Sequence, residues 1–334
     1  SRATITAEFI DRQAPGQTIL QSVNLIPGVN FTNNDPYGSA GGNLRIRGFD
    51  GNRISLTIDG IPLNDTGNYA IYSNQQLDPE LIARASVNMG TTDVDSPTAS
   101  ATGGTINYVT RRPTDDFGVM LQGGVGDDNF GRVFGLVDTG AFGPLGTRGF
   151  GAASYTNYDK WKGPGEIDKW QLNGGLFQEF NGGDDFIFVG FHYNENRNNF
   201  YRNLNLAQYT ATPELENDRQ CIRLTPTNGV ANNESTQNSV VTWNGTTVNN
   251  TSCTNYYNTR INPSNTGNLR AQMSFGLTDN VRLTIDPSFQ YVLANGGGFS
   301  TVAERDDRLD QAGGNAAGAG RDLNGDGDTL DTVM

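Results

Sequence analysis

The chain has 334 residues and a formal net charge of −13; 35% of its residues are hydrophobic and 43 are glycine. This composition is too polar for a helical membrane protein and, with 10% aromatic residues, too aromatic for a disordered one. The acidic balance argues against nucleic acid as a partner, because nucleic-acid binders need basic patches.

Up to about residue 115 the sequence alternates short elements with Gly, Asn and Asp turns, which predicts a small α+β domain over residues 1–115. Apolar residues on one helical face predict a short amphipathic helix over Gln17–Asn24. The run Asp78-Pro79-Glu80 predicts the start of a second helix, because Asp caps well and Pro and Glu suit the first turn. Four short strands are predicted at Leu44–Arg47, Ile54–Asp59, Ser86–Met89 and Thr105–Thr110.

From residue 116 to residue 334 the pattern changes to long strands in which apolar and polar residues alternate. About seven such strands are expected, each near the roughly 9–11 residues that a tilted strand needs to cross a bilayer. They lie at or near Gly118–Gly126, Arg132–Thr139, Phe150–Asn157, Trp170–Glu179, Ile187–Asn194, Leu269–Leu277 and Val281–Phe289.

The connections between these strands differ in length in a regular way. Short turns are expected at Gly140–Arg148, Asn181–Asp184 and Thr278–Asn280, and long connections at about 195–265 and 294–334. This alternation places the long connections on one side, as in outer-membrane β-barrels. A barrel wide enough to hold a plug needs about 22 antiparallel strands, so we expect the remaining strands to follow Met334.

Five motifs in the first domain resemble the plug of TonB-dependent outer-membrane transporters. They are LIPGV (Leu25–Val29), LRIRGF (Leu44–Phe49), LTIDGIPLND (Leu56–Asp65), SVNMG (Ser86–Gly90) and ATGGTINYVTRRP (Ala101–Pro113). The resemblance implies a membrane β-barrel in the bacterial outer membrane, with the α+β plug inside its lumen. It also implies active uptake of a scarce nutrient, by default a ferric siderophore, and no enzymatic activity.

The resemblance implies several partners. These are the TonB–ExbB–ExbD energy-transducing complex, outer-membrane lipid and lipopolysaccharide, and a small-molecule substrate. Residues 3–12 resemble the segment that follows the TonB box, so the box itself is expected upstream of Ser1.

The resemblance also assigns roles to individual residues. Arg47 matches one of two arginines that lock the plug to barrel glutamates, whereas Met89 occupies the place of the second, so half of this lock is missing or replaced. The alternative for Arg47 is an ordinary surface ion pair. The apical loops of the plug are expected to touch the substrate through Asp35, Tyr37, Asn64, Asp65, Asn68, Tyr69, Tyr72 and Ser73. The alternative is that both loops are solvated surface.

Two features of the predicted loops suggest further sites. Asp322, Asn324, Asp326 and Asp328 recur at every second position, as in the first half of a calcium loop, and Asp331 is a substitute for the missing glutamate. The alternative is an acidic loop without Ca²⁺; no other cofactor is required. Cys221 and Cys253 are predicted to form a disulfide that closes a loop in an oxidising compartment, the alternative being two free thiols.

Two other functions compete with transport. One is a secreted or surface β-rich binding protein or adhesin that binds glycans, and the other is a receptor-like relative specialised for assembly or signalling. An enzyme is not expected, because the sequence has no serine elbow and no phosphate loop, and its one histidine, His192, lies on the polar face of a predicted strand.

Overall fold

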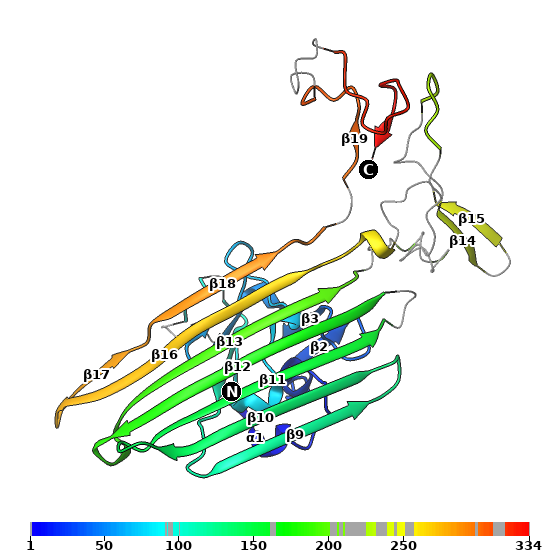
Figure 1. The fold of residues 1–334 in the computed structure, drawn as a ribbon. Coiled ribbons are helices and arrows are strands. Elements are labelled where there is room, and N and C mark those ends of the chain that lie inside the picture. Colours follow the sequence, from blue (N-terminus) through cyan, green and yellow to red (C-terminus); the bar gives the residue numbers. More distant parts are fainter. Residues whose placement is uncertain are drawn as a thin grey trace. The chain divides into compact units, whose positions relative to one another are not determined.

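The computed structural model describes residues 2–90, 92, 96–99, 101–160, 165–200, 206, 210, 225–231, 239–243, 246–250, 257–297, 300–309 and 318–333. The chain divides into two compact units. The first unit consists of Ser1–Trp161, Glu166–Arg197 and Pro263–Ala294, and the second of Lys162–Gly165, Asn198–Asn262 and Asn295–Met334. The first unit contains the N-terminal domain and a wall of long strands (Figure 1).

The N-terminal domain is built on a five-stranded sheet with the order β1-β7-β8-β5-β6. Its strands are β1 (Arg2–Thr6), β5 (Ile54–Ile58), β6 (Ile61–Pro62), β7 (Ile82–Met89) and β8 (Gly104–Thr110). Strands β5 and β8 run parallel, and the other neighbours are antiparallel. A second sheet has the order β2-β3-β4, with β2 (Val29–Asn33), β3 (Gly42–Ile46) and β4 (Phe49–Asp50).

Short helical elements connect these strands: α1 (Ala7–Ile10), α2 (Ile19–Val23) and the 3-10 turns η1 (Gly51–Arg53), η2 (Ser73–Gln75) and η3 (Pro79–Leu81). The predicted amphipathic helix is confirmed as α2, which buries Ile19, Leu20 and Val23 completely. The amide of Thr18 donates to the Gln21 side chain at 3.1 Å and so fixes the first turn of α2.

The second predicted helix is wrong. Asp78 is followed by the single 3-10 turn η3, and β7 begins directly after it. The helix signals of the first turn are overridden because Ile82–Met89 pairs with both β1 and β8. Asp78 does not cap η3 with its side chain, which is bonded to the wall instead.

The hairpin between β5 and β6 shows why the Asp-Gly pair is needed. Asp59 and Gly60 have φ angles of +51° and +87°, which suits a two-residue turn between twisted strands. Ile58 and Ile61 face each other across this turn. The turn leaves the Asp59 side chain 1% exposed, so its carboxylate needs partners within the protein.

The wall is an eight-stranded antiparallel sheet with the order β17-β16-β13-β12-β11-β10-β9, in which β18 also pairs with β16. Its strands are β9 (Phe117–Val125), β10 (Gly131–Phe142), β11 (Thr147–Asp159), β12 (Glu166–Phe180), β13 (Asp185–Asn198), β16 (Ser264–Thr278), β17 (Val281–Ile285) and β18 (Ser288–Ala294). Strands β12 and β16 have 15 residues each, enough to cross a bilayer at a tilt.

The last predicted strand, Val281–Phe289, is divided in two by Asp286-Pro287 and extends further, to Ala294. Both parts pair with β16, so the interruption is local. Proline has no N–H to contribute to a ladder, but the Pro287 carbonyl still accepts from Ala271 at 2.9 Å.

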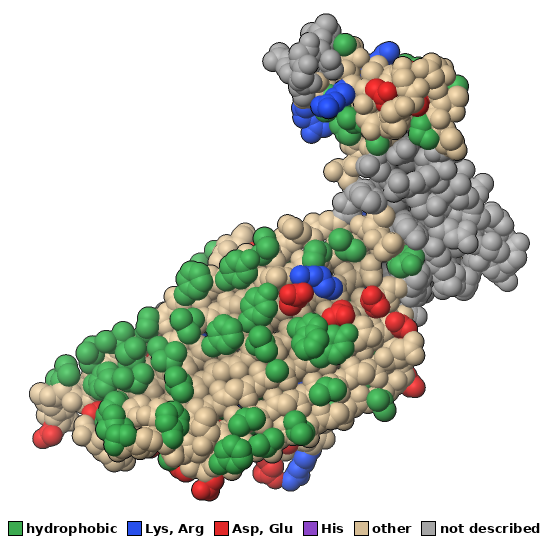
Figure 2. Space-filling view, viewed as in Figure 1, with side chains coloured by type: hydrophobic (Ala, Val, Ile, Leu, Met, Phe, Trp, Pro, Cys, Tyr) green, Lys and Arg blue, Asp and Glu red, His purple; other side chains and the backbone are tan. Residues whose placement is uncertain are grey.

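The two faces of the wall differ as the alternation predicts. On β12, Trp170 and Leu172 are 52% and 49% exposed, while Gln171 between them is 3% exposed. Figure 2 shows hydrophobic side chains spread over the outer face of this sheet, with few charged groups among them. The polar face is buried because the N-terminal domain lies against it (Figure 1).

The three predicted tight turns are confirmed between β10 and β11, between β12 and β13, where the 3-10 turn η4 (Asn181–Gly183) forms, and between β16 and β17. They lie at the same end of the sheet. The turn at 126–130, which joins β9 to β10 at the opposite end, is short as well. Within the described residues, no helix has the length and apolar character to cross a membrane.

In its described part, the second unit includes two small antiparallel strand pairs and a 3-10 turn. β14 (Ser239–Trp243) pairs with β15 (Thr246–Asn250), and β19 (Val302–Ala303) pairs with β20 (Thr332–Val333); the turn is η8 (Tyr257–Thr259). Cys221 and Cys253 lie outside the described residues, so the predicted disulfide stays a prediction.

Candidate functional site

The contact between the N-terminal domain and the wall is held first by Arg132 on β10. Its guanidinium bonds Asp78 at 2.9 Å and Glu80 at 2.6 Å, and its side chain is only 3% exposed. The hydroxyl of Ser154 on β11 donates to Asp78 at 2.7 Å. Burial raises the pKa of Glu80, although the hydrogen bond from Arg132 opposes this shift. One cation of the wall thus compensates two buried carboxylates of the domain.

A second buried ion pair joins Arg270 on β16 to Asp59 in the hairpin turn. The Nε atom of Arg270 donates to Asp59 at 2.7 Å, and the two side chains are 2% and 1% exposed. Thr110 completes the cluster, because both its amide and its hydroxyl donate to the same carboxylate, at 2.9 and 2.6 Å. Removing one partner of such a buried pair costs about 3–5 kcal/mol.

The segment that leaves β8 adds two more arginine contacts. Arg111 pairs with Asp138 on β10 at 2.8 Å. The guanidinium of Arg112 lies 3.9 Å from the ring centroid of Phe188 on β13. Both side chains therefore attach the end of the N-terminal domain to the inner face of the wall.

Arg47, the predicted lock residue, lies just after β3 with a φ of +50° and an exposed side chain. Its amide donates to the Gly28 carbonyl at 2.8 Å. Its guanidinium lies against Gly90, so close that a Cβ atom on Gly90 would be 2.9 Å from Nη1. Met89, where the second arginine is missing, is buried with its sulfur near Gly28. The locking role of Arg47 stays a prediction.

The contacts of Arg132 and Arg270 have the opposite polarity to the predicted lock, since these arginines belong to the wall and their carboxylate partners to the N-terminal domain. Arg111 with Asp138 has the polarity of the predicted lock, with the arginine on the N-terminal domain and the carboxylate on the wall. The sequence prediction missed Arg132 and Arg270 together with their partners Asp59, Asp78 and Glu80. A signal was present: Arg270 occupies the polar set of an alternating strand, where a charged side chain must face the lumen.

The first predicted substrate loop, at residues 33–43, is organised by Asp35, which is fully buried. Its carboxylate accepts hydrogen bonds from the amides of Tyr37, Gly38, Ser39 and Ala40 and from the Tyr158 hydroxyl of β11. This carboxylate therefore fixes the shape of the loop and ties it to the wall.

Tyr37, the other predicted contact in this loop, packs against the wall. Its ring stacks on Phe130 with 4.1 Å between centroids and lies 4.9 Å from Tyr158. Its hydroxyl donates to the Asp127 carbonyl at 3.1 Å.

The second predicted loop contains two buried residues. Asn64 is 7% exposed and bonds the backbone of Leu56 at 2.8 Å and that of Ile54 at 2.9 Å. Ser73 is 1% exposed and accepts from the Gly41 amide at 3.0 Å. This last bond brings the two predicted loops side by side.

The other predicted residues of the second loop are Asp65, which is half-buried, and Asn68, Tyr69 and Tyr72, which are exposed. Asp65 accepts from the amides of Gly67 and Asn68 at 2.7 and 3.1 Å, which closes a turn. Asn68 donates to the Tyr72 hydroxyl at 3.3 Å. Tyr69 and Tyr72 are 36% and 37% exposed, so both rings are available to a ligand.

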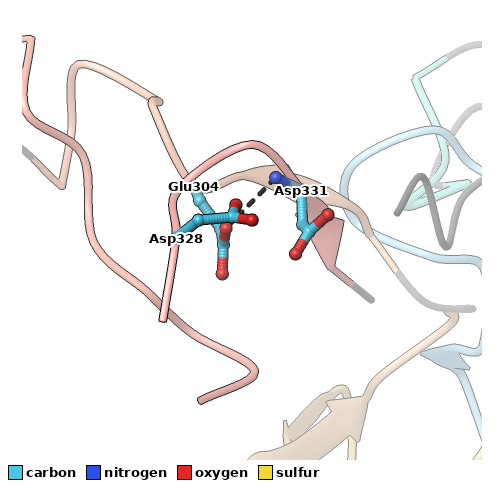
Figure 3. Close-up of side chains that lie close together, drawn as sticks. All are labelled: Glu304, Asp328 and Asp331. Atoms are coloured by element: carbon cyan, nitrogen blue, oxygen red, sulfur yellow. Dashed lines mark hydrogen bonds between the residues drawn. The ribbon is translucent and has the colours of Figure 1, made fainter. Parts of the chain in front are cut away.

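The predicted calcium loop lies in the second unit and gathers a different set of oxygens. Asp322 accepts from the amides of Gly325 and Gly327, and Asn324 from the amide of Asp326. Asp328 and Asp331 instead meet Glu304: one carboxylate oxygen of each lies within 4.8 Å of the others (Figure 3).

Glu304 is the residue that the sequence prediction missed in this loop. It is fully buried and accepts from the amides of Leu323 at 2.6 Å and Asp331 at 3.1 Å. Asp331 is 2% exposed. Hard carboxylate oxygens in this arrangement suit a cation such as Ca²⁺.

A family model described as TonB-dependent Receptor Plug Domain matches residues 1–105. The ferric enterobactin receptor PirA of Pseudomonas aeruginosa is 30% identical over 122 residues, which is 33% of this chain and 16% of that protein.

Solved structures resemble a larger part of the chain. The ferric citrate transporter FecA in its unliganded form matches with a TM-score of 0.61 at 17% identity, over 90% of this chain and 41% of that one. The siderophore receptor PiuA from Acinetobacter baumannii matches with a TM-score of 0.59 at 14% identity, over 88% of this chain and 36% of that one. The pyoverdine outer membrane receptor FpvA from Pseudomonas aeruginosa PAO1 matches with a TM-score of 0.58 at 19% identity, over 87% of this chain and 37% of that one.

At such identities the likeness is one of fold. The chain spans 16% of the curated relative and between 36% and 41% of these solved chains. The predicted fold class, a plug domain followed by strands of a membrane β-barrel, is confirmed.

Proposed function

Because residues 1–105 are the plug domain of a TonB-dependent receptor, we propose that the protein imports a ferric siderophore across the bacterial outer membrane. The observation that carries the proposal is a plug bound by buried ion pairs to the polar face of a strand wall whose other face is apolar. A plug fixed in this way closes the lumen at rest, so passage of a solute needs an energy source.

TonB, driven by ExbB and ExbD, is the proposed energy source, and the apolar outer face of the wall is the proposed contact with lipid and lipopolysaccharide. The names of the matched proteins support siderophores as substrates, because they include receptors for ferric enterobactin and pyoverdine. We assign contact with the substrate to the half-buried Asp65 and the exposed residues Asn68, Tyr69 and Tyr72. The buried residues Asp35, Asn64 and Ser73, with Tyr37, hold the two loops in place.

The test is uptake of radioiron by cells that lack their own siderophore receptors and express the full-length protein. Ferric enterobactin, ferric pyoverdine and ferric citrate are the probes, in strains with and without TonB. Accumulation of one iron complex only in the presence of TonB is the expected result. Binding of every probe without accumulation in any strain would contradict transport and favour a surface receptor.

A gel experiment separates transport from the alternative of a soluble surface adhesin. The unboiled full-length protein should migrate faster than the boiled one, because a closed barrel resists detergent. Complete release from membranes by salt alone would support the adhesin.

We further propose that Ca²⁺ binds beside Glu304, Asp328 and Asp331, whose carboxylates approach one another. Calcium should slow proteolysis of the 300–333 segment in the wild type but not in Glu304→Gln. The variant Asp322→Asn is the matched control, since its carboxylate bonds only amides of its own turn among the described contacts. Equal proteolysis with and without calcium would exclude the ion.

A further inference from the structure

One strip of the inner wall carries only side chains without a formal charge. It consists of three directly facing pairs on β13 and β16, namely His192 with Asn268, Asn194 with Thr266, and Asn196 with Ser264. Directly facing residues point to the same side of a sheet, and all six side chains of this neutral strip are buried.

Several polar atoms on and beside the neutral strip have unused hydrogen-bonding capacity. Among the described residues, Asn196 has no partner for either amide atom, although the residue is fully buried. Asn194 lacks a partner for Oδ1, Asn173 on β12 for Nδ2, and Gln76 of the plug for Oε1. Buried polar groups are almost always hydrogen-bonded, so their concentration here points to a ligand that supplies the missing partners.

A cavity of about 80 Å³ lies at one end of the neutral strip. The wall contributes His192, Thr266 and Asn268 to its lining, and the plug contributes Gln76 and Asp65. At 10–15 Å³ for each water, it has room for about five to eight waters or a chemical group of similar size. Oxygens of Asp65 and Gln76 favour a group that donates hydrogen bonds.

The plug is held more weakly at the neutral strip than at the other parts of its contact with the wall. At this strip the side-chain amide of Asn74 donates a hydrogen bond to the hydroxyl of Ser264 at 3.2 Å. Arg270, next on the same face of β16, forms a buried ion pair. A neutral hydrogen bond opens at lower cost than a buried ion pair, so the plug separates more easily from the wall along this strip.

We propose that the neutral strip and its cavity bind an uncharged hydrogen-bonding group, a hydroxyl or an amide, of a solute that passes between plug and wall. This inference rests on the proposed uptake function. It assigns the inner surface of β13 and β16 as a second binding surface, which meets the loop of Asp65 to Tyr72 at the cavity that Asp65 lines.

Cysteine labelling tests the chemistry of the neutral strip directly. The full-length protein carries Asn196→Cys, with Cys221 and Cys253 replaced by Ser. Three methanethiosulfonates of similar size serve as probes: hydroxyethyl (uncharged), sulfonatoethyl (anionic) and trimethylammonioethyl (cationic). The uncharged probe should react at least about tenfold faster than either ion, because burying a charge is costly.

The matched control is Ala152→Cys, at a buried inward-facing position on β11 that belongs to the apolar core. This cysteine should stay unreactive towards all three probes. An unreactive Asn196→Cys, or equal rates for the three probes, would overturn the inference.

A second variant links the neutral strip to transport. Asn196→Leu keeps the volume and removes the amide, so uptake of ferric enterobactin, ferric pyoverdine or ferric citrate should slow about tenfold, the effect of one lost hydrogen bond. Surface binding should be unchanged, and Phe191→Leu on the outer face of β13 is the control.

If the wild type transports one of these complexes and Asn196→Leu transports it at the same rate, the inference about the neutral strip is refuted, while the proposed function stands. If the wild type transports none of these complexes, the proposed function fails, and the labelling rates then decide whether the neutral strip binds uncharged groups.

Discussion

Replacing Arg132 by Met should loosen the plug from the wall. Methionine fills much of the space, but Asp78 and Glu80 remain buried, with 5% and 12% of their side chains exposed and no cation between them. Breaking a buried ion pair costs about 3–5 kcal/mol. At about 1.4 kcal/mol for each factor of ten, the equilibrium for plug docking should fall by two to three and a half powers of ten.

The assay is limited proteolysis of the full-length protein in outer-membrane vesicles across a urea series. Plug peptides should appear at lower urea in Arg132→Met, while the barrel stays protected. The matched control is Arg45→Met, which removes the ion pair between Arg45 and Asp50. These two groups are 2.8 Å apart, and their side chains are 49% and 59% exposed. A surface pair contributes about 0–1 kcal/mol, so this control should resemble the wild type.

The loss of plug docking in Arg132→Met should also depend on pH. Burial already raises the pKa of Glu80, and without Arg132 the docked plug binds protons more tightly than the released plug. Docking then weakens as pH rises, so the difference from the wild type should shrink when the pH is lowered from about 7 to about 5. If Arg132→Met and Arg45→Met release the plug at the same urea concentration, the buried ion pairs do not hold it.

Three further predictions concern the loop, the plug sheet and the outer face. Asp35→Ala removes the acceptor for four backbone amides, so loop 33–43 should become protease-sensitive and the substrate Kd should rise about tenfold, as for one lost charged hydrogen bond. Gly104→Ala places a Cβ atom 2.3 Å from the Asn88 carbonyl and should reduce folded protein in the membrane on immunoblots. Leu269→Arg, at a position 50% exposed on the outer face, should destabilise the barrel by about 2–4 kcal/mol in urea unfolding.

The strands of the wall could be predicted from sequence because apolar residues recur at every second position, and residues two apart on a strand lie on the same face of the sheet. Leu269 and Arg270 illustrate this: the first is exposed on the outer face and the second is buried against the plug. The plug motifs likewise predicted the Asp59-Gly60 turn, since two successive positive φ angles demand such residues.

The ion pairs could not be predicted in the same way. Arg132 meets Asp78 only because a particular plug turn faces a particular wall strand, and sequence periodicity contains no information on that docking. The substrate contact of Asp35 stays a prediction, and the sequence did not reveal that its carboxylate also binds the amides of its own loop. Glu304 joins the acidic loop through a contact between distant segments, which a local motif does not reveal.

The polarity of the buried ion pairs has a consequence for the passage of a solute. The carboxylates of Asp59, Asp78 and Glu80 travel with the plug, whereas Arg132 and Arg270 are fixed in β10 and β16. If the proposed uptake displaces the plug, opening these two contacts leaves the guanidinium groups of Arg132 and Arg270 on the wall and carries their carboxylate partners away. The wall surface beside these two arginines would then attract anions, whereas Asp138, released from Arg111, would repel them.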